Sequence, residues 1–377
     1  MSPDPHHRDA RPHGDPVFAC SLTGEPVAAS VRVWRSAAGA PLVPRWPLPS
    51  WNAVDEGTRS VWRYRAWLPL PAGTEPLTLG EGGTPLVPVT VLGIPVQVKV
   101  DYLQPTGSYK DRGSAVLAAA LTAAGVRSAV EDSSGNAGAS LAAYLGRAGI
   151  ALKLFVPQGT PPVRVAQAAA AGAKVDTRAA TRAQATELAM AAATGSVVYA
   201  SHVYSPYFLA GQATMAFELY EELGRRAPDR VIVPVGHGVL LLGLYHGFRQ
   251  LQLAGLTGHV PRLYGVQAAV CAPVYQAFAK GADCVTKVAP RRTAAVGISI
   301  AEPPRGREVL AAVRETGGAV LSVSEAEIRR GQSLAAKSGW YVEAASAAAV
   351  AAVAKLDKVL AGDGITVLPL TGSGLKQ

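Results

Sequence analysis

Short β-branched runs alternate with Ala- and Leu-rich stretches along most of the chain from about residue 94. The first cycle reads PVQVKV at 95–100 and then RGSAVLAAALTAAG at 112–125. Runs of the first kind have the apolar or period-2 pattern of strands, whereas the second kind has the 3.6-residue period of helices. The alternation predicts βαβ units, and therefore an α/β fold with doubly wound, mostly parallel sheets.

The same alternation continues to the C-terminus without a fixed-period repeat. Further strands are predicted at SAVED (128–132), ALKLFVP (151–157), SVVYAS (196–201), RVIVPV (230–235) and ITVLPL (365–370). Further helices are predicted at 136–149, 180–193, 208–224, 324–339 and 344–360. Parallel sheets bind ligands at the carboxyl ends of their strands, so a site is expected where strands lead into helices.

The N-terminal part differs in composition and periodicity. Residues 17–75 hold five of the six tryptophans, many prolines and little periodicity. We predict an irregular N-terminal segment at 1–75, a large α/β domain from 76–112 with 206–377, and a small α/β domain from 113–205. The polar, proline-rich first sixteen residues are expected to be a frayed arm, because they have no apolar core for a signal peptide or a membrane span.

Composition and charge narrow the class of protein. Of the 377 residues, 49% are hydrophobic and 17% charged, which is an ordinary globular balance. The formal charge is +9, but the arginines are scattered, without a basic run or an aromatic-interleaved strip. We therefore expect a small anionic ligand and no nucleic acid. Three widely spaced cysteines indicate no disulfide framework, so the expected compartment is the cytoplasm.

The stretch PTGSYKDRG places Lys110 in a loop that leads into a predicted helix. An amine that is partly desolvated near a helix N-terminus has a lowered pKa and can form a Schiff base with an aldehyde. The alternative is a solvated lysine with no chemical role.

A second junction is SSGNAG, which follows the strand SAVED and opens the next helix. The backbone amides of Ser133, Ser134 and Gly135, with Asn136 and Ala137, can form a concave site for a carboxylate at the positive end of the helix. The Asn136 amide can also donate to a phenolate oxygen. A turn that only caps the helix is the alternative.

A third junction is VPVGHGVL at 233–240, where an apolar strand leads through two glycines into an apolar helix. Gly236 and Gly238 let backbone amides up to Val239 and Leu240 approach a phosphate, and His237 is expected to contribute only its backbone amide. The spacing lacks G-x-G-x-x-G and G-K-[ST], which argues against a dinucleotide site or an NTPase loop.

The last junction is TGSGLK at 371–376. A hydroxyl such as that of Thr371, at the end of a strand, can face a ring nitrogen as a neutral partner. An aldehyde-binding lysine, a carboxylate site, a phosphate site and a hydroxyl for a heteroaromatic nitrogen together indicate pyridoxal 5'-phosphate bound near an amino-acid substrate.

Six motifs in order also resemble the threonine synthases and related fold-type-II (tryptophan synthase β-like) pyridoxal phosphate enzymes, from about Gly80 to the C-terminus. They are PTGSYKDRG, SSGNAGASLAAY, VPVGHG, YGVQAA with CAP, VEAASAA and LTGSGLK. The resemblance implies Lys110 as the lysine bonded to the cofactor, Asn136 at its 3'-oxygen, 236–240 at its phosphate and Thr371 at its pyridine nitrogen. It also implies 133–137 at the substrate carboxylate, and we expect a homodimer.

Two departures from the family bear on the reaction. Threonine synthases of this type read STGNTS where this chain has SSGNAG, and AIRI where it has GISI, so Ser299 replaces an arginine. A second anion site, for the phosphate of O-phosphohomoserine, would then need another cation such as Lys153, Arg164 or Arg292.

The N-terminal segment departs as well. Many relatives carry two cysteine pairs there, whereas this chain has Thr23, Arg35 and Ala38 at three of those four positions and only Cys20 at the fourth. One thiolate cannot hold tetrahedral zinc, so the segment is expected to be a degenerate zinc ribbon without metal.

The predicted function is a lyase or replacement reaction on an amino acid with a β or γ leaving group, nearest to threonine synthase. The alternatives are a β-eliminating serine or threonine dehydratase, a diaminopropionate ammonia-lyase, and a β-replacement enzyme such as cysteate synthase. A non-catalytic regulator that keeps the cofactor is disfavoured by the presence of all four junctions, and a nucleotide-dependent oxidoreductase by the absent glycine fingerprint.

Overall fold

The computed structural model describes residues 17–289, 291–360 and 362–376. The predicted frayed arm falls on residues 1–16, outside the described part of the chain. The chain forms two compact units, one with the residues up to Gly82 and Lys110–Gln212, the other with Gly83–Tyr109 and Ala213–Gln377. The domain boundaries expected from the sequence, at residues 75, 112 and 205, stay a prediction.

The second unit is built on a six-stranded sheet in the order β12-β11-β10-β13-β5-β4. Neighbouring strands are parallel except for the hairpin of β4 and β5, which is antiparallel. The strands are β4 (Leu86–Val91), β5 (Ile94–Lys99), β10 (Arg230–Pro234), β11 (Arg262–Ala268), β12 (Ala319–Val323) and β13 (Thr366–Pro369). Its helices are α6 (Val239–Leu253), α7 (Pro273–Ala279), α8 (Gly306–Glu315), α9 (Glu325–Lys337), α10 (Ala344–Ala352) and α11 (Asp357–Leu360).

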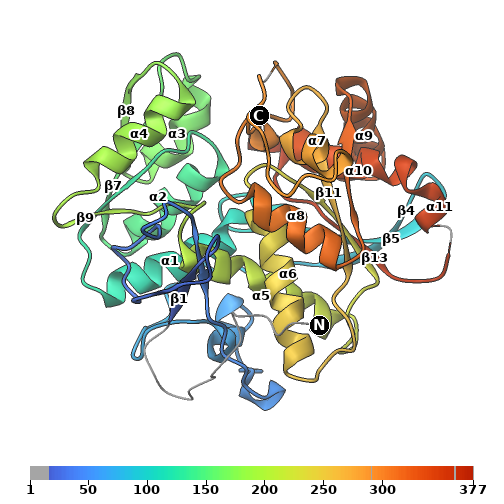
Figure 1. The fold of residues 1–377 in the computed structure, drawn as a ribbon, viewed down its shortest axis with the longest axis horizontal. Helices are drawn as coiled ribbons and strands as arrows, with labels where there is room; N and C mark the ends of the chain where they lie inside the picture. Colours follow the sequence, from blue (N-terminus) through green and yellow to red (C-terminus); the bar gives the residue numbers. More distant parts are fainter. Residues whose placement is uncertain (1–16, 290, 361, 377) are drawn as a thin grey trace. The chain divides into compact units, whose positions relative to one another are not determined.

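Both faces of this sheet are covered by helices. Along β11, Tyr264 and Val266 belong to the core cluster that includes the alanines of α10, which packs against α9 (Figure 1). A Cβ on the intervening Gly265 would instead contact Leu241 of α6, at 3.4 Å. Because successive strand residues point to opposite faces, α10 and α6 lie on opposite sides of the sheet. The strand is therefore apolar on both faces, as the sequence pattern of a buried parallel sheet requires.

The first unit contains a four-stranded parallel sheet in the order β8-β7-β6-β9. Its strands are β6 (Ser128–Glu131), β7 (Ala151–Pro157), β8 (Lys174–Ala179) and β9 (Val197–Tyr199), and its helices are α1 (Lys110–Ala123), α2 (Asn136–Arg147), α3 (Pro162–Ala170) and α4 (Arg182–Ala192). The boundary between the units falls inside α5 (Pro206–Glu222). The prediction of an α/β fold with mostly parallel sheets is confirmed.

The N-terminal segment contains a small antiparallel sheet of β1 (Phe18–Cys20), β2 (Pro26–Val27) and β3 (Leu42–Pro44). The rest is mostly loop and 3₁₀-helix, including the stretch Val61–Trp67, in which Trp62 and Trp67 are buried. Tryptophan packing thus supplies core where periodic elements are few. The sequence pattern did not reveal the three short strands, since two- and three-residue strands carry too few positions to show a period.

The prediction of one helix over 344–360 is wrong. The α-helix ends at Ala352, continues as a 3₁₀ turn over Val353–Lys355, and restarts as α11 after Leu356, whose φ of −111° is not helical. The Asp357 carboxylate accepts a hydrogen bond from the amide of Lys358. An Asp side chain that bonds nearby amides competes with the helical pattern, and an alanine-rich sequence does not reveal such a break.

Candidate functional site

The residues predicted for the site fall into two groups. Lys110 and the loop 133–137 belong to the first unit, whereas 236–240 and Thr371 belong to the second. The loop 133–137, the loop 236–240 and Thr371 each follow a strand of their own unit, as expected for a parallel α/β sheet, whereas Lys110 begins the first α-helix of its unit.

Lys110 is the first residue of α1, and its side chain is half-buried. Its Nζ lies 5.7 Å from the ring centroid of the fully buried Phe208. The start of α1 is tied to α2, because the Ser140 hydroxyl donates to Asp111 Oδ1 at 2.5 Å. A lysine held at a helix start beside an apolar ring has the partly desolvated surroundings that favour a reactive amine.

The loop 133–137 connects β6 to α2 and is tightly folded. A Cβ on Gly138 would lie 2.0 Å from the carbonyl oxygen of Ser133, so the turn requires glycine there. The N-cap of α2 is Gly135, which has no side chain to bond the first-turn amides. A Cβ on Gly135 would lie 3.5 Å from a terminal nitrogen of Arg164. Amides at a helix N-terminus together with a guanidinium form a site suited to an anion.

The loop 236–240 connects β10 to α6 in the same way. Gly238 is the N-cap of α6 with a φ of +87°, and a Cβ there would lie 2.2 Å from Val309 Cγ2. A Cβ on Gly236 would lie 3.0 Å from the carbonyl oxygen of Gly297. Both glycines are therefore required by close packing and, at Gly238, by a left-handed conformation. The helix start presents backbone amides without an N-cap side chain, as a phosphate site does.

Thr371 is buried just after β13, and its hydroxyl lies 2.9 Å from that of Ser346 on α10. The Ser346 oxygen already accepts hydrogen bonds from the amides of Thr371 and Gly372, at 2.9 and 3.2 Å. The Ser346 hydrogen therefore points to Thr371, which leaves the Thr371 O–H to donate elsewhere. Ser346 lies in the VEAASAA motif, but the sequence does not predict its contact with Thr371.

A second buried hydroxyl lies close to Thr371. Ser108 pairs with Gly372 in an isolated β-bridge, and its side-chain oxygen is fully buried with no hydrogen-bond partner among the described residues. Buried hydroxyls normally have partners. The hydroxyls of Ser108 and Thr371 are suited to bind a polar heteroaromatic ring. The loop 236–240, which is suited to a phosphate, follows β10 of the same sheet.

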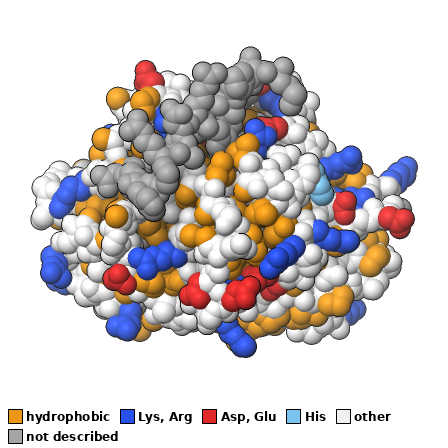
Figure 2. All heavy atoms as spheres, turned by 90° about the horizontal axis from the view of Figure 1, so that it is seen from below, with side chains coloured by type: hydrophobic (Ala, Val, Ile, Leu, Met, Phe, Trp, Pro, Cys, Tyr) orange, Lys and Arg blue, Asp and Glu red, His pale blue; other side chains and the backbone are white. Residues whose placement is uncertain are grey.

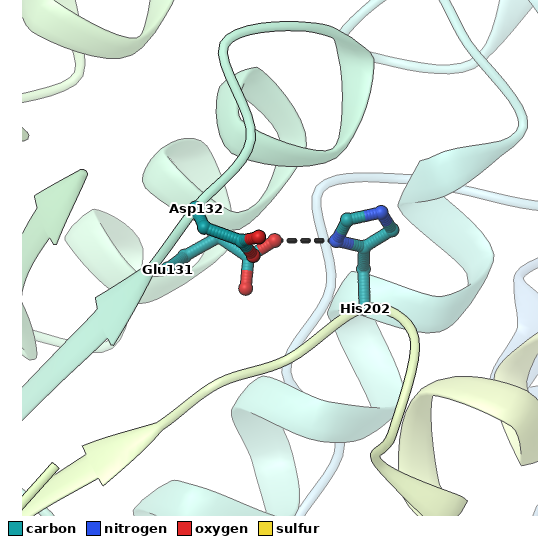
Figure 3. A group of neighbouring side chains, drawn as sticks. All are labelled: Glu131, Asp132 and His202. Carbon is teal, nitrogen blue, oxygen red and sulfur yellow. Dashed lines mark hydrogen bonds and ion pairs between the residues drawn. The ribbon is translucent and has the colours of Figure 1, made fainter. Parts of the chain in front are cut away.

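Sequence reasoning missed a buried cluster in the first unit. Glu131, Asp132 and His202 bring their carboxylate and imidazole atoms within 4.8 Å of one another (Figure 3). Glu131 is the last residue of β6, Asp132 follows it directly, and His202 follows the neighbouring strand β9. The available signal was an acid pair and a histidine at the carboxyl ends of two predicted strands, but only the parallel pairing of those strands places them together.

The other lysines that could carry an aldehyde have charged partners. Lys99 is fully buried and contacts Glu218 at 2.5 Å and Glu222 at 2.7 Å. Lys153 pairs with Asp176 at 2.9 Å and lies over the ring of Phe155. On the face drawn in Figure 2, Lys and Arg side chains are scattered and form no continuous strip. Among the described residues, no helix is long and apolar enough to cross a membrane.

At the expected zinc-ribbon positions, the Cys20 thiol lies 3.1 Å from the Ser36 hydroxyl and donates to it. Ser36 in turn accepts a hydrogen bond from the amide of Ala40. A hydrogen-bonded thiol thus connects the two turns of the small sheet. The absence of zinc there stays a prediction.

The model of the family described as "Pyridoxal-phosphate dependent enzyme" matches residues 77–372. The threonine synthase of Methanosarcina acetivorans is 36% identical over 327 residues, which cover 84% of this chain and 80% of that protein. The threonine synthase of Synechocystis is 34% identical over 377 residues, covering 96% and 92%. A solved threonine deaminase from T.th. has a TM-score of 0.66 at 28% identity, covering 77% of this chain and 92% of the other.

Proposed function

The chain belongs to the pyridoxal-phosphate dependent enzymes as a threonine synthase-like lyase of fold type II, and from this premise we propose that it converts O-phosphohomoserine to threonine and phosphate. The observation that carries the proposal is the extent of the similarity. Relatives named threonine synthase match more than four fifths of the chain at 34–36% identity.

The proposed cofactor contacts follow the two groups of residues. Lys110 would bond covalently to the cofactor aldehyde, Asn136 would donate to its 3'-oxygen, and Thr371 would donate its hydroxyl hydrogen to the ring nitrogen. The amides of 236–240 would bind the phosphate. When bound, the cofactor supplies an electron sink for the carbanion formed at the substrate α carbon.

The protein's own groups then perform the proton transfers. The amides of 133–137 hold the substrate carboxylate, which fixes the α C–H bond in one orientation. The Lys110 amine would remove the α proton and later return a proton to the product. Thr371 would be a neutral partner for the ring nitrogen, so the cofactor would be a weaker electron sink than one with a carboxylate partner.

The substrate phosphate needs a cation of its own, and Arg164 is the one we propose. Its guanidinium lies against Gly135 in the loop proposed for the substrate carboxylate. Ser299, where relatives have arginine, follows a segment whose Gly297 packs against Gly236. Its hydroxyl contacts the Cys271 thiol, whose pKa burial raises. The Ser299 side chain is uncharged, and the proposal therefore assigns the phosphate to Arg164.

A second candidate is β-elimination from serine or threonine, or from diaminopropionate. The turn at Gly138 favours β-elimination. It excludes any side chain there, whereas the STGNTS motif of threonine synthases has a serine hydroxyl at this position. A β-replacement such as cysteate synthesis would need, in addition, a second nucleophile in the same pocket.

Product analysis tests both candidates. The holoenzyme is incubated with O-phosphohomoserine, serine, threonine, phosphoserine and diaminopropionate, and threonine, phosphate, ammonia and keto acid are measured. We expect threonine and phosphate from O-phosphohomoserine with a kcat/KM of about 10⁴ per molar per second or more. Keto acid and ammonia as the only products would support elimination instead.

Two arginine variants test the phosphate site. Arg164→Gln is expected to raise the KM for O-phosphohomoserine about tenfold while leaving the KM for a phosphate-free amino acid unchanged. The control is Arg178→Gln, an exposed arginine paired with Asp176. Ser299→Arg is expected to lower the KM for O-phosphohomoserine. An unchanged KM in Arg164→Gln would assign the phosphate to another cation, such as Arg292.

We also propose a homodimer in the cytoplasm. Its support is a set of exposed apolar side chains in the second unit, Leu103, Tyr341 and Leu375, which are 58%, 62% and 85% exposed. Apolar groups so exposed are favourable contacts for a second copy. Light scattering after size exclusion should give twice the chain mass of 38.9 kDa, and a monomer mass would contradict the proposal.

A further inference from the structure

The acid–imidazole contact between Glu131 and His202 is the strongest feature that the proposed reaction does not use. Glu131 is fully buried and His202 is 3% exposed. His202 Nδ1 is in hydrogen-bond contact with Glu131 Oε1 (Figure 3). The other carboxylate oxygen, Oε2, is buried and has no hydrogen-bond partner among the described residues. A buried charged carboxylate with one unsatisfied oxygen would be costly, so this pair needs a proton.

The neighbouring carboxylate, Asp132, has a different set of hydrogen bonds. Asp132 accepts hydrogen bonds from the hydroxyls of Tyr199, at 2.8 Å, and Thr186. Two hydroxyl donors stabilise the charged form of a carboxylate. Both oxygens of Asp132 therefore have a hydrogen-bond donor, whereas Glu131 Oε2 has none among the described residues. The shared proton belongs to Glu131 and His202.

The pair lies next to Lys110. His202 packs edge-to-face on the ring of Phe208, with centroids 6.1 Å apart, and Lys110 Nζ lies 5.7 Å from the centroid of the same ring. The charged groups that act on Glu131 are Asp132 at the end of β6, Lys110 on α1 and Arg182 on α4. Burial, followed by the Asp132 charge, raises the pKa of Glu131 well above its ordinary value, and Lys110 and Arg182 oppose this rise.

We propose that Glu131 and His202 are positioning residues that share one proton beside Lys110 and thereby set the protonation of the Lys110 nitrogen. The pair is neutral when it holds this proton and carries one negative charge without it. Giving up the proton while Lys110 takes one keeps the total charge of the buried group constant. Lys110 could then alternate between its charged and neutral forms at a small electrostatic cost. A base that removes and returns a proton must alternate in this way.

This inference rests on the proposed role of Lys110, and its test uses the absorbance of the bound cofactor as a function of pH. The band reports the protonation of the nitrogen that joins the cofactor to the lysine. Glu131→Gln removes the acid, so that nitrogen should lose its proton about one pH unit lower. His202→Gln removes the imidazole that shares the proton and leaves Lys110 and Arg182 as the cations acting on Glu131, so the nitrogen should keep its proton to a pH about one unit higher.

Opposite shifts distinguish a shared proton from a structural role, because a general loosening of the fold would move both variants in the same direction. The matched control is Glu81→Gln, another buried carboxyl of the first unit, which accepts a hydrogen bond from Tyr144. Burial and hydrogen bonds to Leu79, Tyr144 and Thr78 are among the main causes of the shift in the Glu81 pKa, and we expect this variant to leave the cofactor titration unchanged. Thermal melting shows whether each variant is folded.

A second readout does not depend on the cofactor band. With nitrogen-labelled histidine, the imidazole signal that disappears in His202→Gln belongs to His202, and Glu131→Gln should shift it. Shifts of one sign in both variants, no shift in either, or an unchanged His202 signal would overturn the proposal. So would a stoichiometric divalent ion that is lost from Glu131→Gln, because a metal would then neutralise the carboxylates in place of the proton.

Borohydride reduction and peptide mapping of the wild type separate this inference from the proposed function. Attachment at Lys110 without the opposite shifts would refute the shared proton and leave the cofactor role standing. Attachment at another lysine would refute the cofactor role of Lys110, and the shared proton with it.

Discussion

Lys110 and Lys99 show how differently two lysines of one chain can be used. Lys110 is half-buried at the start of α1 beside an aromatic ring, whereas Lys99 is fully buried between two glutamates. The Lys110 amine lies beside an aromatic ring, whereas the Lys99 amine is held by two carboxylates and the carbonyl oxygen of Thr84.

Lys110→Ala is expected to abolish the cofactor band and turnover while the melting temperature stays within a few degrees of the wild type. The physical reason is that the change removes one half-buried amine from a helix start and leaves the apolar core intact. Absorbance, activity and circular dichroism measure the three quantities. An undiminished, borohydride-reducible cofactor bond in this variant would mean that another lysine carries the cofactor.

Lys99→Met is expected to destabilise the fold by about 3–5 kcal/mol, because it leaves the buried Glu218 carboxylate without its cation. Lys153→Met is the matched control. Lys153 is 42% exposed and pairs with Asp176, so its loss should cost no more than about 1 kcal/mol. Urea unfolding of the two variants measures the difference, and equal midpoints would contradict the role given to the buried pair.

At the scale of elements, the two ends of α6 show the difference between a glycine needed for space and one needed only for conformation. Both Gly238, before the helix, and Gly255, after it, have positive φ, at +87° and +72°. A Cβ would meet Val309 at 2.2 Å in the first case and nothing within 4 Å in the second. Only the first should affect the end of the helix that is proposed to bind the phosphate.

Gly238→Ala is therefore expected to weaken cofactor binding at least tenfold, since the loop must move away from Val309 and its amides lose their alignment. Gly255→Ala should cost only the strain of a left-handed alanine, about 1 kcal/mol, with unchanged cofactor affinity. Cofactor titration of the two apoproteins by fluorescence measures both affinities. Equal affinities would show that the loop tolerates the displacement.

At the scale of the whole molecule, buried acids connect stability to pH. Burial raises the pKa of Glu81 above its ordinary value of 4.5, against hydrogen bonds from the Leu79 amide and the hydroxyls of Tyr144 and Thr78. The folded protein therefore binds this proton more tightly than the unfolded chain. The resulting stability is fully present below pH 4.5 and is lost as the pH rises through the raised folded-state pKa.

Glu81→Gln should remove this dependence. As the pH rises above 4.5, the free energy of unfolding of the wild type should fall relative to that of the variant, by at most about 1.4 kcal/mol per pH unit. Urea unfolding at several pH values measures it. A difference that stays constant, or grows in favour of the wild type, would show that Glu81 is not protonated in the folded state.

The sequence by itself determined the α/β class, most helices and strands, and the junctions at which Lys110, Gly238 and Thr371 stand. It could do so because burial on both faces of a parallel sheet leaves apolar runs, and tight turns leave glycines, that are visible along the chain. The helix break at Leu356 and the short N-terminal strands left no such pattern.

The tertiary structure alone decided which side chains meet. Glu131 and His202 are 71 residues apart and come together only because β6 and β9 pair in parallel. The partnership of Ser346 with Thr371 and the position of Arg164 against Gly135 have the same origin. A period in the sequence reports which face of an element is buried, whereas contacts between distant elements depend on strand order and register, which local patterns do not encode.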